Sequence, residues 1–290
     1  MLYKIPDDEL EKLIRTYCRD FTALAREGRF DPITGRDEEI TQSILILLQK
    51  GRKNVMLQAP AGVGKTALVV GLAQQIVAGN VPELLQNARV LEIDLASMAA
   101  GTDSIAEFQG RFVPLVKGIA ERYHDPSLPR TILFIDEIHT IMPSCEGSAY
   151  KGLSEVMKPY LTVGDIYVIG ATTKDEHRIY VEIDPAMDRR FQKVFLDVPD
   201  EAATLVILEA IKGGYEKHHG ITIPTEMCSL IVKLTEEHMR KRNQPDKSIT
   251  TMDGACALHV MAHGRGGYLS QDAVLDIVSD ETGVHAKALV

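Results

Sequence analysis

The chain has 290 residues and 45% of them are hydrophobic, which is enough apolar material for one large domain and a second, smaller one. Its formal net charge is −9 at pH 7, and such a surface repels the phosphates of nucleic acids and of anionic membranes. The sequence has neither an apolar run of roughly 20 residues nor the start of a signal peptide, so we expect a cytoplasmic protein with no nucleic-acid or membrane partner.

The first predicted element is a helix. Apolar residues recur at helical spacing over residues 8–27, and Gly28 follows as a stop. Such a helix either packs against a core or serves as a docking site, and packing is the commoner use. A second helix is expected over residues 37–50, and a short buried strand over residues 54–58.

Beyond this strand, helices and apolar strands alternate along the chain. Helices are expected after Lys65 and over residues 105–123 and 153–161. Strands are expected over residues 90–95, 132–135 and 166–169. The alternation predicts a parallel sheet with helices on both faces, in which a ligand would bind at the carboxyl ends of the strands.

After Asp200 the pattern is helical only. Helices are expected over residues 202–215, 225–238, 248–262 and 271–279. We therefore predict an α/β fold with two domains. The large domain, residues 1–199, contains the leading helix and the parallel sheet, and the small domain, residues 200–290, is all helical.

Residues 59–66, with the sequence APAGVGKT, have the pattern of a phosphate-binding loop and lie between a predicted strand and a predicted helix. Gly62 and Gly64 allow backbone N–H groups to surround a β-phosphate, and Lys65 reaches the β- and γ-phosphates. Thr66 offers its hydroxyl to Mg²⁺. Alanine at position 59 replaces the usual glycine. This substitution narrows the range of backbone angles that the residue can adopt but removes no phosphate ligand. The alternative is an ordinary glycine-rich turn before a helix.

Two carboxylates follow the apolar strand that ends at Ile135. In a phosphoryl-transfer site, Asp136 would orient the water shell of a magnesium ion and Glu137 would polarise the attacking water. An apolar strand that ends in two acidic residues is common by itself. Together with Lys65, the pair indicates a nucleotide-hydrolysing site.

Thr173 follows the next strand along the chain, where a polar side chain would lie beside the γ-phosphate and the attacking water. We consider it a candidate sensor of the nucleotide. The same threonine could cap the helix that is expected to begin at Lys174, and the sequence leaves both roles open.

Arg189 and Arg190 are adjacent and follow the main elements of the sheet. A guanidinium group can stabilise the charge on a transferred γ-phosphate, and it is often supplied by a neighbouring subunit. The alternative is a pair of surface arginines that form ion pairs with Asp184 or Asp188.

These residues together resemble the first ATPase domain of the Clp-type AAA+ ring ATPases, which are protein-unfolding and disaggregating chaperones. The similarity extends from about Leu24 to the end of the chain. The matching stretches occur in the same order, at residues 25–28, 31–40, 62–67, 71–73, 133–140, 170–173, 189–192, 218–220 and 245–249.

The resemblance implies a P-loop AAA+ domain with a helical lid that uses ATP and Mg²⁺ and assembles into a homo-oligomeric ring, a hexamer. It also implies roles for individual residues. Thr173 would be the sensor, and Arg189 and Arg190 the arginine fingers. Residues that would contact the nucleotide are Pro32, Ile33, Gly62, Val63, Gly64, Lys65, Thr66, Ala67 and Asp246, and those that would hold the metal are Thr66 and Asp136.

The chain departs from the family in the segment that corresponds to the loop of the central pore. Ser104 replaces the aromatic residue that grips a polypeptide, and a serine offers too little surface for that role. Tyr150 lies where a second pore loop is expected, either as a substitute or as an ordinary surface residue. The second ATPase domain and the coiled middle insertion are missing, so we do not expect a self-sufficient unfoldase.

These features bear on three possible functions. The first is an ATPase that acts in a ring to remodel or assemble a protein partner, and the intact nucleotide residues favour it. The second is a nucleotide-gated scaffold or adaptor with little unfoldase activity, which Ser104 and Ala59 favour. The third, a DNA-directed AAA+ protein, is disfavoured by the acidic charge and by the lack of a recognition helix or basic arm.

Overall fold

The computed structural model describes residues 4–289, which fall into two compact units. The first unit contains residues 4–30, together with Glu38–Ala59 and Lys65–Leu196. The second unit contains Asp31–Asp37, Pro60–Gly64 and residues 197–289. No helix within residues 4–289 is long and apolar enough to cross a membrane.

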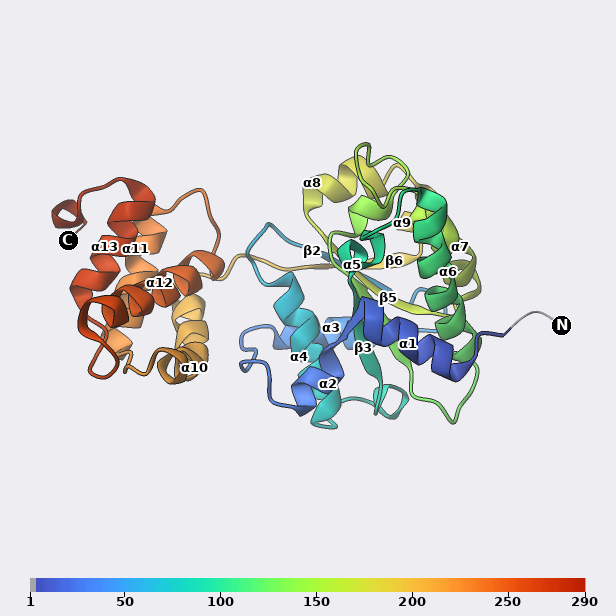
Figure 1. The fold of residues 1–290 in the computed structure, drawn as a ribbon, viewed down its shortest axis with the longest axis horizontal. Coiled ribbons are helices and arrows are strands. Elements are labelled where there is room, and N and C mark those ends of the chain that lie inside the picture. Colours follow the sequence, from blue (N-terminus) through green and yellow to red (C-terminus); the bar gives the residue numbers. More distant parts are fainter. Residues whose placement is uncertain (1–3, 290) are drawn as a thin grey trace. The chain divides into compact units, whose positions relative to one another are not determined.

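A six-stranded sheet forms the centre of the first unit (Figure 1). The strands in spatial order are β1 (Cys18–Asp20), β3 (Arg89–Ile93), β4 (Thr131–Ile135), β5 (Tyr167–Thr172), β2 (Asn54–Gln58) and β6 (Phe191–Phe195). All neighbouring pairs are parallel except β1 and β3, which are antiparallel. Every residue of β2 and β5 is buried, as expected for strands covered by helices on both faces. The predicted parallel α/β sheet is therefore confirmed.

Helices cover both faces of this sheet (Figure 1). One side carries α1 (Asp7–Tyr17), α6 (Ile105–Arg122) and α7 (Leu153–Val163), and the other carries α2 (Phe21–Arg26), α3 (Asp37–Leu47) and α4 (Lys65–Val77). Shorter helices, α5 (Leu95–Ala99), α8 (Lys174–Glu176) and α9 (Pro185–Asp188), lie in the connections between the strands and longer helices. Phe108 and Phe112 of α6 pack with Leu133 and Ile135 of β4 in the main core.

The prediction of one continuous helix over residues 8–27 is wrong. The helix ends at Tyr17, and Cys18–Asp20 form β1 at the edge of the sheet, paired with β3. Asp20 then caps α2 by accepting a hydrogen bond from the N–H of Ala23 at 2.9 Å. Hydrogen bonding to an open sheet edge and a new helix cap both favour the break, and helical periodicity shows neither.

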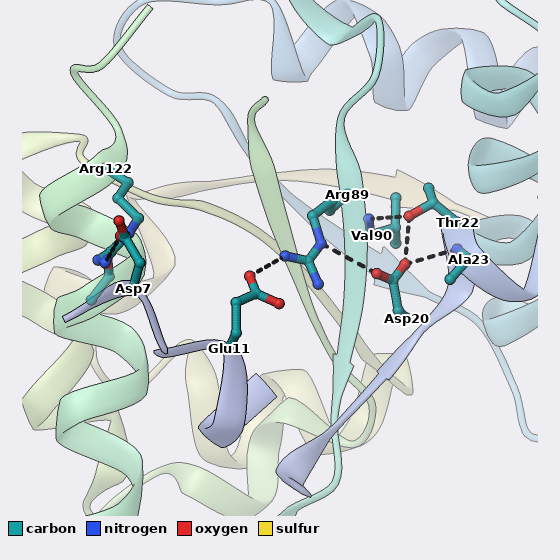
Figure 2. A network of polar contacts seen from close by, with 9 residues as sticks. Asp7, Glu11, Asp20, Thr22, Ala23, Arg89, Val90 and Arg122 are labelled. Atoms are coloured by element: carbon teal, nitrogen blue, oxygen red, sulfur yellow. Dashed lines mark hydrogen bonds and ion pairs between the residues drawn. The ribbon is translucent and has the colours of Figure 1, made fainter. Parts of the chain in front are cut away.

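The leading helix α1 is a packing element. Leu10 and Ile14 are buried in the main core, and a Cβ added to Gly118 of α6 would lie 2.9 Å from Cδ1 of Leu10. Polar contacts also hold this segment, because Arg89 of β3 pairs with Glu11 at 2.6 Å and with Asp20 at 3.2 Å (Figure 2). The glycine therefore allows the two helices to approach closely, and Arg89 joins α1 to β1.

The second unit has its own core, formed by four helices. These are α10 (Glu201–His219), α11 (Thr225–His238), α12 (Asp246–His263) and α13 (Gln271–Thr282). Asp200 caps α10 by accepting a hydrogen bond from the N–H of Ala203 at 2.8 Å. Leu208, Ile231 and Met252 from three of these helices are completely buried together. The prediction of an all-helical segment after Asp200 is confirmed.

Candidate active site

The phosphate-binding loop follows β2 directly. The N–H of Ala59 donates to the carbonyl of Thr172 at 3.2 Å, which continues the pairing of β2 with β5 by one residue. Ala59 is completely buried and does not have the left-handed backbone that favours glycine, so alanine fits without strain. Lys65 begins α4, and its ammonium group donates to the carbonyl of Ala59 at 3.0 Å.

The middle of this loop belongs to the second unit, and two of its glycines have left-handed backbones. Gly62 has φ +77° and Gly64 has φ +101°. A Cβ at Gly62 would also lie only 2.8 Å from the Cβ of Asp246, which is the first residue of α12. Gly62 is thus required both by its backbone and by the close approach of Asp246.

Thr66 and Asp136 are brought together in the first unit, although 70 positions separate them in the sequence. The hydroxyl of Thr66 donates to Oδ2 of Asp136 at 3.0 Å, and Oδ1 of Asp136 accepts a hydrogen bond from the N–H of Glu137 at 3.0 Å.

The Thr66 hydroxyl and the Asp136 carboxylate are hard oxygen ligands of the kind that Mg²⁺ prefers. Within residues 4–289 no cluster of three or more His, Cys, Asp and Glu could hold a metal alone. Magnesium in phosphoryl-transfer sites typically takes one or two protein ligands and completes its shell with phosphates and water. The two residues therefore fit the ion.

Glu137 has an unusual backbone conformation, with φ +48° and ψ +47°. Among the described residues other than glycine, only Asn87 shares a positive φ. This conformation costs a non-glycine residue about 1 kcal/mol or more, and such strain is concentrated at functional sites. It directs an exposed carboxylate out of the end of a buried strand.

A cavity of about 460 Å³ lies beside this carboxylate pair, lined in part by Glu92 of β3, Arg19 of β1 and Tyr150. Burial raises the pKa of Glu92, and the negative charge of Asp136 acts in the same direction. Arg19 opposes this shift through its contact with Glu92 at 3.1 Å. The carboxyl ends of β3 and β4 therefore form one acidic edge.

Thr173 performs the capping role that the sequence suggested. Its hydroxyl accepts a hydrogen bond from the N–H of Glu176 at 3.2 Å, and the Glu176 carboxylate accepts one from the N–H of Thr173 at 3.0 Å. Burial alone would raise the pKa of Glu176, but the two bonds to Thr173 and the contact with His139 lower it. The cap fixes the backbone of Thr173 at the end of β5 and leaves a sensor role open.

Sequence reasoning missed a buried histidine beside this cap. His139 follows the carboxylate pair, and its Nδ1 lies 3.0 Å from the hydroxyl of Thr172 and 3.4 Å from Oε2 of Glu176. Its ring stacks on Tyr180. The residue lies in a stretch that resembles the Clp family, but a lone histidine after a strand does not indicate which strand it will contact. His139 connects the residues after β4 with those at the end of β5.

The two arginines differ in exposure. Arg189 is exposed, whereas Arg190 is half-buried and its Nε is buried without a hydrogen-bond partner among residues 4–289. In the described part of the chain neither pairs with the expected acids, because Asp184 pairs with Lys158 at 2.7 Å. Asp188 contacts His177 at 3.0 Å and Lys193 at 3.5 Å. The alternative of surface ion pairs with Asp184 or Asp188 is therefore not found.

The remaining candidates for nucleotide contact lie in both units. In the second unit, Pro32 is exposed and Ile33 is half-buried in the segment Asp31–Asp37, and Val63 is buried in the phosphate-binding loop. Ala67 is half-buried in α4 of the first unit. Arg36, in the same segment as Pro32, donates to the carbonyl of Val63 at 2.9 Å and to that of Asp197 at 3.1 Å.

The residues that correspond to the pore loops have local structural roles. Ser104 caps α6 by accepting a hydrogen bond from the N–H of Glu107 at 3.2 Å. Tyr150 is half-buried and its ring packs 5.7 Å from that of Phe108, at the edge of the main core. Tyr150 is therefore neither an ordinary surface tyrosine nor a side chain that projects freely to contact a polypeptide.

Two family models match the chain, and they describe the two parts of one kind of protein. The model for the "ATPase family associated with various cellular activities (AAA)" matches residues 55–197, and the model for the "AAA lid domain" matches residues 200–276. The chain belongs to the AAA family of ATPases. In this AAA ATPase the first match covers the phosphate-binding loop, the carboxylate pair and both arginines, and the second covers α10–α12.

Curated relatives of this AAA ATPase are ClpB chaperones. The chaperone protein ClpB of Aquifex aeolicus (strain VF5) is 44% identical over 250 residues, which are 86% of this chain and 24% of that protein. ClpB 1 of Parasynechococcus marenigrum (strain WH8102) is 40% identical over 252 residues, or 87% of this chain and 28% of that protein. The chain thus spans about a quarter of the length of these relatives.

Solved structures of Hsp104 have the same fold. The S. cerevisiae Hsp104–ADP complex matches with a TM-score of 0.83 at 33% identity, over 96% of this chain and 46% of that one. A closed-state reconstruction of Hsp104 with ATPγS and FITC-casein gives a TM-score of 0.83 at 34% identity, over 94% of this chain and 46% of that one. The predicted resemblance to Clp-type chaperones is confirmed, as is the α/β domain with a helical lid.

Proposed function

We propose that this chain hydrolyses ATP as part of a homohexameric ring that remodels or assembles a protein partner. The observation that carries the proposal is the contact of Thr66 with Asp136 beside the strained backbone of Glu137. Family membership supports ATP as the nucleotide, because the matching model describes ATPases. Residues 1–199 would form the nucleotide-binding domain, and residues 200–290 the lid.

Each proposed site residue performs one task in this reaction. Gly62, Val63, Gly64 and Ala67 supply backbone around the phosphates, and Lys65 neutralises their charge. Thr66 and Asp136 would hold Mg²⁺, which supplies charge neutralisation at the transferred phosphoryl group. Glu137 orients and polarises the attacking water, with Thr173 beside it.

Further roles are proposed for residues of the second unit and for two arginines that act on a neighbouring subunit. Pro32 and Ile33 would contact the adenine, and Asp246 would lie over the nucleotide. Arg189 and Arg190 would act on the site of the next subunit, where a guanidinium stabilises transition-state charge. The exposure of Arg189 and the partial exposure of the Arg190 side chain suit groups that act on a neighbouring subunit.

A protein partner is proposed because one similar structure, that of Hsp104, contains FITC-casein. Ser104 serves as a helix cap at the position of the gripping aromatic, so we expect remodelling or assembly rather than strong threading. Net charge −9 argues against nucleic acid or membrane as the partner. All four cysteines are free thiols, which suits a reducing cytoplasmic location.

The test is ATP turnover at protein concentrations where a ring can form, followed by native mass spectrometry with ATP. We expect wild-type protein to hydrolyse ATP and Glu137→Gln to bind ATP with little turnover, because the substitution removes the carboxylate but keeps the shape. Glu146→Gln, at an exposed glutamate outside the site, serves as the control. If wild type were no faster than Glu137→Gln, the hydrolytic proposal would fail and a nucleotide-gated scaffold would remain.

A further inference from the structure

Two carbonyl groups of the phosphate-binding loop are held by side chains from other parts of the second unit. Nδ2 of Asn243, which precedes α12, donates to the carbonyl of Ala61 at 3.0 Å. Nη2 of Arg36 donates to the carbonyl of Val63 at 2.9 Å. Arg36 and Asn243 are 207 positions apart in the sequence, yet they form hydrogen bonds with alternate peptide groups of one short loop.

A held carbonyl fixes the direction of the amide that follows it. In a trans peptide the C=O and N–H groups lie in one plane and point in opposite directions. Fixing the carbonyl of Ala61 therefore directs the N–H of Gly62 away from Asn243, and fixing that of Val63 directs the N–H of Gly64 away from Arg36. These are the amides that a phosphate-binding loop presents to its anion.

The loop needs such support because of its glycines. Gly62 and Gly64 have no side chains that restrict their backbones, and both adopt positive φ values. Without external contacts, a loop of this composition can rotate its peptide groups and turn carbonyl oxygens, which repel phosphate, toward the ligand.

Arg36 is placed for this task by burial as well as by geometry. It is 8% exposed, and its guanidinium also donates to the carbonyl of Asp197 at 3.1 Å. Nη2 of this one side chain thus joins the segment Asp31–Asp37, the phosphate-binding loop and the start of the chain that enters the lid. Asn243 holds the same loop from the turn before α12, three residues before Asp246.

We propose that Arg36 and Asn243 are positioning residues that hold the Ala61 and Val63 carbonyls away from the bound nucleotide, so that the Gly62 and Gly64 amides are set for its phosphates. The inference rests on the proposed function, because it assumes that this loop binds ATP or ADP. Neither side chain contacts the nucleotide in this role; each acts through the backbone that it holds.

The first experiment measures ADP binding to the full chain by calorimetry. Asn243→Ala removes one donor from a half-buried side chain, and we expect the ADP dissociation constant to rise about three- to tenfold, the effect of one hydrogen bond. We expect Arg36→Lys to weaken ADP binding at least as much, because Nη2 of Arg36 donates to both carbonyls and the shorter lysine side chain cannot place its nitrogen at that point.

Arg265→Lys is a matched control. Arg265 lies in the second unit and also donates to two backbone carbonyls, those of His218 at 2.6 Å and His219 at 3.2 Å. It makes the same kind of contact away from the phosphate-binding loop. Its substitution is expected to leave the ADP dissociation constant unchanged.

A second readout separates positioning from general damage to the fold. The amides bind phosphate in the ground state and the transition state alike, so Asn243→Ala should raise the KM for ATP and change kcat little. Its melting temperature without nucleotide should lie within about 4 °C of that of wild type, the effect of one lost hydrogen bond. If Arg36→Lys does not fold, the Asn243→Ala result alone decides.

The inference is overturned if Asn243→Ala folds normally and binds ADP as wild type does, or if Arg36→Lys weakens ADP binding no more than Arg265→Lys. If wild type binds neither ADP nor ATP, the proposed function itself fails and the inference fails with it. If wild type binds the nucleotide and the Asn243 and Arg36 variants bind it equally well, the positioning roles are rejected while the proposed function stands.

Discussion

Nε2 of His177 lies 3.0 Å from Oδ1 of Asp188, and this contact joins the segment after β5 to the residue immediately before Arg189. His177 is 3% exposed, and Lys193 approaches the same carboxylate at 3.5 Å. Burial, reinforced by the charge of Lys193, lowers the pKa of His177 although Asp188 acts in the opposite direction. The imidazole is therefore neutral at pH 7 and packs as a buried, polar group.

This lowered pKa predicts acid sensitivity. The unfolded chain binds a proton at His177 more readily than the folded chain does. The neutral His177 therefore makes its full contribution to the free energy of unfolding above the ordinary histidine pKa of about 6.5. It is lost as the pH falls from there toward the lower folded pKa. We expect the free energy of unfolding to decrease over this window, and His177→Gln to reduce the decrease. Urea unfolding at several pH values checks this, with the exposed His124→Gln as the control. Equal pH slopes for His177→Gln and wild type would contradict it.

A second prediction concerns the magnesium dependence of turnover. Thr66→Ala removes the hydroxyl that contacts Asp136, so the Mg²⁺ concentration for half-maximal turnover should rise about tenfold or more. Thr66→Ser retains the hydroxyl and should keep the dependence near that of wild type. Titration of ATPase activity with Mg²⁺ measures both. An unchanged midpoint in Thr66→Ala would rule out the proposed metal-binding role of this residue.

A third prediction concerns the arginines. Arg190→Ala should retain ATP affinity but lose most turnover, because the guanidinium acts on the site of the adjacent subunit. Mixing it with Glu137→Gln protein should restore part of the activity, since an intact Arg190 then faces an intact Glu137 at some interfaces. Arg178→Ala, at an exposed arginine that pairs with nearby Asp175, is the control. Absence of any recovery in mixed rings that are shown to form would argue against a role in trans.

A fourth prediction concerns the leading helix. Arg89 is partly buried and pairs with both Glu11 and Asp20, so Arg89→Ala should lower the free energy of unfolding by about 1–3 kcal/mol. Arg29→Ala, at a largely exposed arginine 3.9 Å from Glu27, should change it by less than about 0.5 kcal/mol. Chemical denaturation compares the two variants. Similar small losses in both would show that the Arg89 network does not stabilise α1.

Much of the fold was predictable from local patterns. Strands such as β2 and β4 are short and apolar throughout because helices cover both of their faces, and the glycines that follow several helices end them locally. Cys18–Asp20 was not predictable in this way. Its residues fit the helical periodicity around them, and only the open edge of β3 makes a strand more favourable there.

The sequence by itself determined the phosphate-binding loop and the Asp136–Glu137 pair, because the residues of each motif are adjacent and their chemistry depends on short spacing. Only the tertiary structure decided that Thr66 reaches Asp136, that His139 contacts Thr172, and that Arg36 and Asn243 hold the same loop. These contacts join residues that are far apart along the chain. Which of them meet depends on the order of strands and the packing of helices, and a pattern of neighbouring residues does not specify either.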